Sequence, residues 1–374
     1  MSKTLARHRR YLAEQVERDL ARKMVFVGGP RQVGKTTLAR QLLGRHAGYL
    51  SWDIAEDRER ILRRELPATQ LVVFDELHKY RRWRNYLKGL YDREDHSRIL
   101  VTGSARLDLY RFGGDSLQGR YHCLRLHPLS VAELGIATGR DLLQLTTLGG
   151  FPEPFFGGSE KEARRWSREY RTRLIRDEIP SLEHVSDLGQ LEHMMVRLPE
   201  LVGSPLSING LREHLQINHA TASRWLTIFE NLYAIFRLPP FGTPRLRAVK
   251  KAQKHYHWDW TLVADPSLRF ENMVASHLLK WVHYEQDVAG RHLELRYFRD
   301  IDGREADFVV MEGRTPRWFV ECKMGDAPVD SGLVYLKTRF PAAAAWQLSA
   351  TGTRDYVRDG IRVAPATTFL RTLI

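Results

Sequence analysis

The sequence has little cysteine and lacks any long apolar stretch. Its 374 residues include only two cysteines, Cys123 and Cys322, which lie far apart in the chain. This spacing excludes a disulfide framework and a cysteine-rich zinc site, and it fits a reducing compartment. No run approaches the roughly 18 apolar residues that a membrane span needs, and the first residues carry charge without the apolar core of a signal peptide. We therefore expect a cytoplasmic protein that has no membrane partner.

Acidic residues are outnumbered by basic ones. The sequence holds 58 lysines and arginines against 45 aspartates and glutamates, which gives a net charge of +13 at pH 7. An excess of this size favours polyanionic partners, and nucleic acid is the commonest polyanion in a cell. A solvated basic surface without such a partner is the alternative. The length is sufficient for two or three domains.

Short apolar runs alternate with helical patterns over about the first 130 residues. After a helical pattern at residues 5–22, the apolar runs occupy residues 24–27, 49–54, 71–74, 99–101 and 121–126, and the helical patterns occupy residues 36–43, 82–90 and 107–111. Such alternation is typical of a parallel sheet with helices on both faces. We predict an α/β domain over residues 1–130.

The predicted secondary structure changes twice after residue 130. Residues 131–200 have helical patterns, interrupted by a segment rich in glycine, proline and phenylalanine at residues 149–158. A compact helical unit with a strand-like tail follows at residues 201–245, and strands return in residues 246–374, notably at 293–299, 306–311 and 318–322. We therefore predict domain boundaries near residues 130, 200 and 245.

Residues 29–36 match the pattern G-x-x-x-x-G-K-[ST] between an apolar strand and a helix. In such a P-loop the backbone N–H groups face the phosphates, Lys35 reaches the β- and γ-phosphates, and the Thr36 hydroxyl ligates Mg²⁺. The motif therefore predicts that the protein binds ATP and Mg²⁺. The predicted nucleotide-binding residues are Gly29, Pro30, Arg31, Gln32, Val33, Gly34, Lys35, Thr36 and Thr37.

Polar residues at the ends of two further strands complete the predicted catalytic site. Asp75 and Glu76 follow an apolar run, where Asp75 is placed to hold Mg²⁺ and Glu76 to polarise the attacking water. A simple surface strand end is the alternative. The run at 99–101 leads to Thr102 and Ser104, and we expect this strand to lie between the other two, so that either hydroxyl can bond the attacking water or the γ-phosphate. Ser104 fits a helix N-cap equally well.

Arg120 directly precedes the fifth apolar run. An arginine at this point is expected at the edge of the subunit, where it can reach the γ-phosphate bound by a neighbouring copy as an arginine finger. An ordinary surface arginine is the alternative. The predicted catalytic residues are thus Lys35, Glu76, Thr102 and Arg120.

These motifs together resemble a known family. Residues 29–37, Asp75 with Glu76, residues 102–105, residues 116–120 and residues 127–134 resemble prokaryotic AAA+ P-loop ATPases that carry a C-terminal domain of uncharacterised function. The resemblance covers nearly the whole chain. It implies a parallel five-stranded AAA+ core, a helical lid, a winged-helix domain and a C-terminal α/β domain similar to the restriction-endonuclease-like fold. We also expect a homo-oligomer, with a hexamer as its form.

Residues 206–230 have the spacing of a helix-turn-helix. In its second helix, Thr221, Ser223 and Arg224 are expected to reach DNA phosphates or bases. Residues 233–240 predict the start of a wing, which a basic cluster follows at Arg245, Arg247, Lys250, Lys251 and Lys254. A winged helix that serves only packing or protein contacts is the alternative; the basic cluster favours DNA.

The C-terminal part contains the residue types of the PD-(D/E)-x-K nucleases. Asp307 lies on one predicted strand, and Glu321 and Lys323 lie two residues apart on the next, hence on one face of it. There Asp307 and Glu321 are predicted to share a divalent metal, with Lys323 steadying the hydroxide or the phosphate. Glu271 is a candidate fourth group. A fold kept for DNA binding without cleavage is the alternative.

The sequence thus predicts an ATP-dependent, oligomeric AAA+ machine that acts on DNA, including branched or junction DNA. An ATP-dependent nuclease of defence or repair is the first alternative. The second is an ATP-driven switch or protein-remodelling factor that has no DNA substrate. Salt-sensitive DNA binding distinguishes the two classes, because neutralising phosphates releases counterions.

Overall fold

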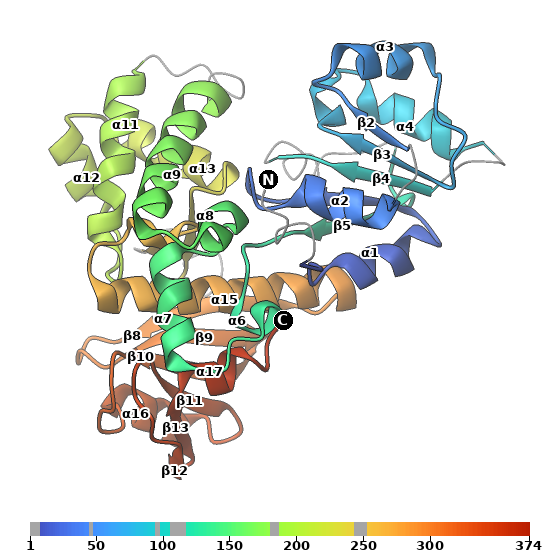
Figure 1. Ribbon diagram of the computed structural model, residues 1–374. Helices are drawn as coiled ribbons and strands as arrows, with labels where there is room; N and C mark the ends of the chain where they lie inside the picture. The colour runs from blue at the N-terminus through green and yellow to red at the C-terminus, as the bar shows by residue number, and fades with distance from the viewer. Residues whose placement is uncertain (1–7, 45–47, 94–97, 105–116, 180–186, 243–252) are drawn as a thin grey trace. The chain divides into compact units, whose positions relative to one another are not determined.

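The computed structural model describes residues 8–44, 48–93, 98–104, 117–179, 187–242 and 253–374. The chain divides into two compact units, Met1–Pro128 and Leu129–Ile374; the first contains a five-stranded sheet, and the second contains a six-stranded and a two-stranded sheet (Figure 1). The division falls next to the boundary predicted near residue 130; the further boundaries stay predictions. Outside the described residues lie the predicted helix at 107–111, Ala105, Ser116, and the basic residues Arg245, Arg247, Lys250 and Lys251.

The first unit contains a five-stranded parallel sheet, as predicted. Its strands lie in the order β2 (Tyr49–Ser51), β3 (Leu71–Asp75), β4 (Arg98–Thr102), β1 (Met24–Gly28) and β5 (Tyr121–Arg125). The placement of β4 between β1 and β3 confirms the expected order. Because all strands are parallel, the residues that follow β1, β3 and β4 meet at one edge of the sheet.

Helices cover both faces of this sheet. The helices are α1 (Ala13–Leu20), α2 (Lys35–Leu43), α3 (Ala55–Arg63), α4 (Trp83–Tyr91) and the short 3-10 helix η1 (Leu77–Lys79). Alternate residues of β1, such as Met24 and Phe26, pack with Trp83 of α4 in one buried cluster. Residues 52–54, predicted as strand, instead lead into α3, which the sequence analysis missed.

The second unit begins with a series of helices. They are α6 (Val131–Leu134), α7 (Gly139–Leu148), α8 (Pro152–Gly157), α9 (Glu160–Arg173), the π-helical turn η3 (Leu174–Glu178), α11 (Leu188–Arg197) and the 3-10 helix η4 (Leu198–Leu201). The segment expected to interrupt them forms α8, with Pro152 in its first turn. The Phe151 ring lies 4.8 Å from that of Trp166 and 5.1 Å from that of Tyr170, so this segment is anchored on α9.

Two helices and a hairpin follow. Helix α12 (Ile208–Leu215) and helix α13 (His219–Asn231) are joined by three residues, of which Gln216 has a left-handed conformation with φ 54°. Strand β6 (Ile235–Leu238) then pairs antiparallel with β7 (Lys254–His257). The boundary predicted near residue 245 therefore falls inside this hairpin.

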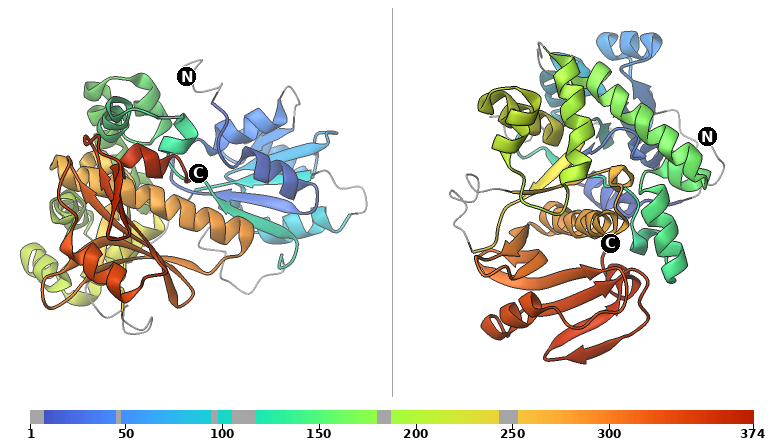
Figure 2. Two further views of the ribbon diagram at one scale, coloured as in Figure 1. Left: turned by 90° about the horizontal axis from the view of Figure 1, so that it is seen from below. Right: turned by 90° about the vertical axis from the view of Figure 1, so that its left-hand side faces the viewer.

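A six-stranded mixed sheet forms the C-terminal part. Its order is β12 (Tyr356–Arg358), β13 (Ile361–Pro365), β11 (Ala344–Ser349), β10 (Thr315–Lys323), β9 (Glu305–Glu312) and β8 (Leu293–Arg299). The 24-residue helix α15 (Pro266–Ala289), preceded by the 3-10 helix η5 (Trp260–Leu262), lies along one face, and α16 (Ser331–Arg339) packs on the other (Figures 1 and 2). The chain ends in α17 (Ala366–Leu370). Among the described residues, no helix is both long and apolar enough to cross a membrane.

Among the described residues of the second unit, His255, His257 and His277 are buried as neutral groups. His277 is held on both ring nitrogens, since Nε2 accepts from the Val131 N–H at 3.0 Å and Nδ1 lies 2.8 Å from the Met273 carbonyl oxygen. Burial lowers the pKa of His255 and that of His277 to about 4. It also lowers the pKa of His257 well below its usual value.

Each of these histidines is expected to lower the stability of the folded protein in mild acid. The unfolded chain takes up protons from about pH 6.5, whereas the folded chain resists them until about pH 4, so the free energy of unfolding falls between these limits by ~1.4 kcal/mol per pH unit for each histidine. His277→Gln keeps a donor and an acceptor but cannot titrate, and it should remove the contribution of one histidine, ~1.4 kcal/mol per pH unit, from the slope of the unfolding free energy against pH. Urea unfolding at several pH values measures the slope, with exposed His214→Gln as control. An unchanged slope in His277→Gln would contradict the assignment.

Candidate functional site

The P-loop has the backbone conformation that phosphate binding requires. Gly29 and Gly34 have φ values of 140° and 104°, which favour glycine. A Cβ atom on Gly29 would lie 2.3 Å from the Leu126 carbonyl oxygen, so no larger residue fits there. Lys35 begins α2, and its buried Nζ donates to the carbonyl oxygens of Gly29 at 2.9 Å and Pro30 at 2.6 Å. The loop thus curls around the ammonium group.

The side chain of Arg10 also holds the P-loop in place. Arg10 is buried, and its guanidinium donates to the carbonyl oxygens of Val33 and His127. It therefore ties the P-loop to the segment that follows β5. The sequence analysis missed Arg10, since nothing in the pattern before α1 distinguishes it from the neighbouring basic residues.

The Asp75 carboxylate accepts hydrogen bonds from three hydroxyl groups. Thr36 Oγ1 donates to Asp75 Oδ2 at 3.0 Å, and Thr102 Oγ1 donates to Asp75 Oδ1 at 2.6 Å. The two groups predicted to hold Mg²⁺, Thr36 and Asp75, are thus brought together. The third hydroxyl belongs to Tyr49 on β2, which donates to Asp75 Oδ2. Burial and then the bond to Asp75 raise the pKa of Tyr49, so it remains a donor.

Tyr49 and Thr102 gain a role in this structure that the sequence analysis did not assign. Tyr49 was missed, because only the pairing of β2 beside β3 places it next to Asp75. Thr102 is fully buried, and its hydroxyl orients Asp75. Its predicted bond to the attacking water stays a prediction.

Glu76 lies at the end of β3 in a strained conformation. Its φ of 57° is in the left-handed region, which costs about 1–3 kcal/mol for a residue other than glycine and is typical of functional positions. Its N–H donates to the Thr102 carbonyl oxygen at 2.9 Å, which fixes the backbone. Its carboxylate lies 3.6 Å from Lys79 Nζ. Burial raises the pKa of Glu76, and the charge of Lys35 partly offsets this.

Arg120 lies at the opposite end of the sheet from the P-loop of its own chain. The Met24 N–H, at the start of β1, donates to the Arg120 carbonyl oxygen at 3.1 Å, whereas the P-loop follows the end of β1. A five-residue strand separates the two by about 16 Å. The Arg120 guanidinium pairs with Asp92, with Nε 2.9 Å from Oδ1. Arg120 is therefore not part of the site formed by its own P-loop.

The arrangement around the P-loop fits a nucleotide with its magnesium ion. Lys35 and the backbone of residues 29–36 would hold the phosphates, while Thr36 and Asp75 would hold Mg²⁺, which offsets the phosphate charge. Glu76 follows Asp75 directly at the end of β3, and its carboxylate lies within the influence of the Lys35 charge. These residues suit hydrolysis of a phosphoanhydride by an activated water.

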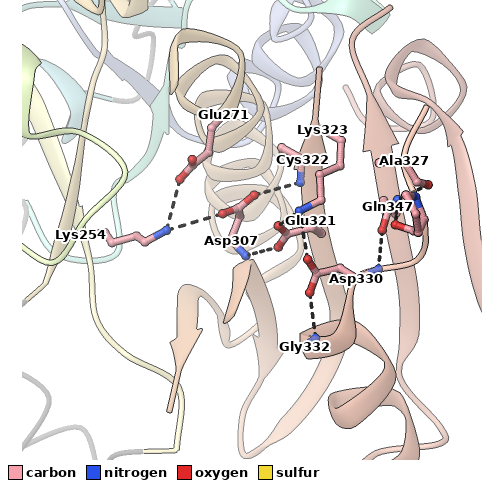
Figure 3. Close-up of polar contacts among 11 residues, drawn as sticks. Lys254, Glu271, Asp307, Glu321, Cys322, Lys323, Ala327, Asp330, Gly332 and Gln347 are labelled. Carbon is pink, nitrogen blue, oxygen red and sulfur yellow. Dashed lines mark hydrogen bonds and ion pairs between the residues drawn. The ribbon is translucent and has the colours of Figure 1, made fainter. Parts of the chain in front are cut away.

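The second unit brings together the four residues predicted from its sequence. Glu271 comes from α15, Asp307 from β9, and Glu321 and Lys323 from β10 (Figure 3). The Asp307 N–H donates to Glu321 Oε2 at 3.1 Å, and Lys323 Nζ donates to Glu321 Oε1 at 2.8 Å. Burial and then the charge of Asp307 raise the pKa of Glu271 and that of Glu321.

The predicted metal site in this carboxylate cluster is not supported by its geometry. Within the described part of the chain, no group of three or more histidine, cysteine, aspartate and glutamate side chains is arranged to hold a metal ion. Instead, Lys254 Nζ lies between two of the carboxylates, 3.3 Å from Glu271 Oε1 and 3.6 Å from Asp307 Oδ1. The sequence analysis placed Lys254 in an exposed basic cluster; the structure buries it at the start of β7.

Comparison with known proteins divides the chain into three matched segments. A family model described as an AAA domain matches residues 21–135. Two models described as domains of unknown function, DUF8612 and DUF4143, match residues 139–269 and 269–369. Together with the parallel sheet and the P-loop, the first match shows that the N-terminal unit is a P-loop ATPase domain of the AAA kind.

The individual proteins that resemble this chain have low sequence identity to it. Uncharacterised proteins of Mycobacterium tuberculosis and Mycobacterium bovis are each 26% identical to this chain, over 92% of its length and 82% of theirs. Among solved structures, a Walker-type ATPase of Pyrococcus abyssi is 16% identical, covers 69% of this chain and 94% of its own, and has a TM-score of 0.42.

Proposed function

We propose that this protein is a Mg²⁺-dependent ATPase that binds DNA through its second unit and uses ATP hydrolysis to act on that DNA. The observation that carries the proposal is the Asp75 carboxylate, which accepts from the Thr36 hydroxyl at 3.0 Å. This contact puts the two proposed Mg²⁺ ligands next to the lysine of the P-loop. Glu76, held in its strained conformation beside them, is the proposed base for the attacking water.

The DNA-binding part of the proposal rests on α12, α13 and the β6–β7 hairpin. Two helices joined by a three-residue turn and followed by an antiparallel hairpin have the order of elements of a winged helix. Thr221 and Ser223 are partly exposed on α13, and Arg224 is exposed. We propose α13 as the helix that enters the DNA groove. The net charge of +13 favours the same partner.

The remaining parts are proposed to serve this activity. Residues 131–200 would form the lid of the ATPase, and the six-stranded sheet with its helices, within residues 246–374, would form a restriction-endonuclease-like domain that contacts DNA, with junction or branched DNA as the proposed substrate. We propose that the protein works as a homo-oligomer, with a hexamer as the expected form, because Arg120 lies too far from its own P-loop to act there.

Salt-dependent DNA binding tests the proposal. The purified chain is incubated with single-stranded, duplex and junction DNA at several salt concentrations, with and without a non-hydrolysable ATP analogue. For 6–10 phosphate contacts, the affinity should fall by about 10³-fold or more between about 50 and 200 mM salt. Weak binding that does not respond to salt would favour a nucleotide switch or a protein-remodelling factor instead.

A matched pair of variants locates the DNA-binding surface. Arg224→Ala should weaken binding to all sequences similarly and reduce the salt slope by about one phosphate contact. Arg63→Ala removes an equally charged, exposed side chain from α3 of the ATPase unit, which is not proposed to contact DNA, and should leave binding unchanged. Equal effects of both variants would show that α13 is not the principal contact.

A further inference from the structure

Lys254 is a buried ammonium group between two carboxylates. Its side chain is 2% exposed, and those of Glu271 and Asp307 are each 11% exposed. The three residues come from β7, α15 and β9, so the ammonium joins the hairpin, the long helix and the C-terminal sheet (Figure 3). Burying a lysine costs several kcal/mol unless it is well paired, and these two carboxylates provide the pairing.

Most oxygens of Asp307 and Glu321 accept hydrogen bonds from the protein itself. Asp307 Oδ1 faces Lys254, and its Oδ2 accepts from the Cys322 N–H at 2.9 Å. Glu321 Oε1 accepts from Lys323 Nζ, and its Oε2 accepts from the Asp307 N–H. Three of the four oxygens of the two carboxylates predicted to share a metal therefore accept hydrogen bonds from the protein, and the fourth, Asp307 Oδ1, lies 3.6 Å from Lys254 Nζ.

The neighbouring carboxylates keep the Lys254 side chain protonated. Burial lowers its pKa, but the charges of Glu271 and Asp307 outweigh burial and raise it. The Tyr256 hydroxyl also donates to Glu271 Oε1 at 2.6 Å, which fixes the carboxylate that faces the ammonium. The main chain of Lys254 pairs with Leu238 on one side and with Pro205 on the other. The backbone of Lys254 is therefore fixed on both sides at the position from which its side chain reaches the cluster.

A divalent ion does not fit beside this ammonium. Mg²⁺ requires oxygen ligands at about 2.0–2.1 Å in a nearly octahedral arrangement, and Mn²⁺ also prefers oxygen ligands. The gap between Glu271 and Asp307 already holds a cation, which would repel a second one at close range.

We propose that Lys254 is the resident cation of the cluster formed by Glu271, Asp307, Glu321 and Lys323, in the place of a divalent metal, so that this site is metal-free and does not cleave DNA. The inference rests on the proposed nuclease-like fold of residues 246–374, and its test uses no DNA and no nucleotide. It explains why the right residue types meet without forming a metal site.

Manganese binding to the full chain tests the proposal. Free Mn²⁺ is measured by electron paramagnetic resonance in the absence of nucleotide. The wild type should bind no more Mn²⁺ than Asp307→Asn does. Lys254→Met, which keeps the length of the side chain but removes its charge, should gain one Mn²⁺ site, and this site should disappear in the double variant with Asp307→Asn. Lys323→Met removes the other lysine of the cluster and should gain no site.

Thermal unfolding gives a second readout. Lys254→Met should unfold at a lower temperature than the wild type, and millimolar Mn²⁺ should restore part of the difference, while the wild type shows no shift. If Lys254→Met does not fold, Lys254→Gln replaces it. A wild type that binds one Mn²⁺ through Asp307 would overturn the proposal whether or not the variants fold. So would folded variants of Lys254 that gain no site. Failure of DNA binding, by contrast, would affect only the proposed function.

Discussion

Replacing Glu76 by glutamine should slow ATP hydrolysis by about 10²–10⁴-fold while leaving Mg²⁺–ATP binding nearly unchanged. Glutamine has the shape of glutamate but cannot accept the proton of the attacking water. The groups that hold the nucleotide and its metal remain, because Thr36, Asp75 and Lys35 make their contacts without the Glu76 side chain. Phosphate release measures turnover, and a fluorescent ATP analogue measures binding.

Two further variants separate this effect from general damage. Lys35→Ala removes the cation that the P-loop encloses and should lose both binding and hydrolysis, unlike Glu76→Gln. Lys79→Ala removes a half-exposed cation 3.6 Å from Glu76 that also pairs with Asp53, and it should keep most activity. Hydrolysis at the normal rate in Glu76→Gln would mean that another group activates the water.

The nucleotide site was largely predictable because its main elements are local in sequence. The P-loop, Asp75 and Glu76 each follow a buried strand directly, and parallel strands bring such strand ends to one edge. Tyr49 was not predictable in this way. It begins a strand of three residues, and its bond to Asp75 depends on the register of β2 against β3.

In the carboxylate cluster, too, some residues were predictable from the local sequence pattern and one was not. Asp307, Glu321 and Lys323 lie on neighbouring strands, and their alternation was sufficient to bring them together. Lys254 lies 53 positions before Asp307 in a stretch of basic residues, and its burial depends on the pairing of β7 with β6. The amount of charge in a sequence thus does not reveal which cation is buried to balance buried acids.

Secondary structure was missed where apolar periodicity was weak. In α3, only Ile61 is buried, so the helix has no apolar stripe and resembles a charged loop in the sequence. Its first turn does carry Glu56 and Asp57, which favour a helix N-terminus. In α8, two prolines and a terminal glycine suggest a loop, yet Pro152 occupies the first helical turn, where its missing N–H is harmless.

Arg120→Ala should lower the ATPase activity of the assembled protein by about 10³-fold or more, with little change in nucleotide affinity. The physical reason is its position. Arg120 lies beside the start of β1, a full strand length from its own P-loop, so its charge can stabilise the transferred phosphoryl group only in a site formed by a neighbouring copy. ATPase rate and nucleotide affinity are measured on the same preparations, above the concentration at which the copies associate.

The ion pair with Asp92 supplies the control that decides between a catalytic and a structural role. Asp92→Asn breaks the pair at 2.9 Å but keeps Arg120, so activity should persist if Arg120 acts on a neighbour and should fall as in Arg120→Ala if the pair merely stabilises the unit. Mixing Arg120→Ala with Lys35→Ala provides the second test. In mixed assemblies, an intact P-loop from one variant meets an intact Arg120 from the other, so part of the activity should return. No recovery on mixing, or full activity in Arg120→Ala alone, would exclude a site shared between copies.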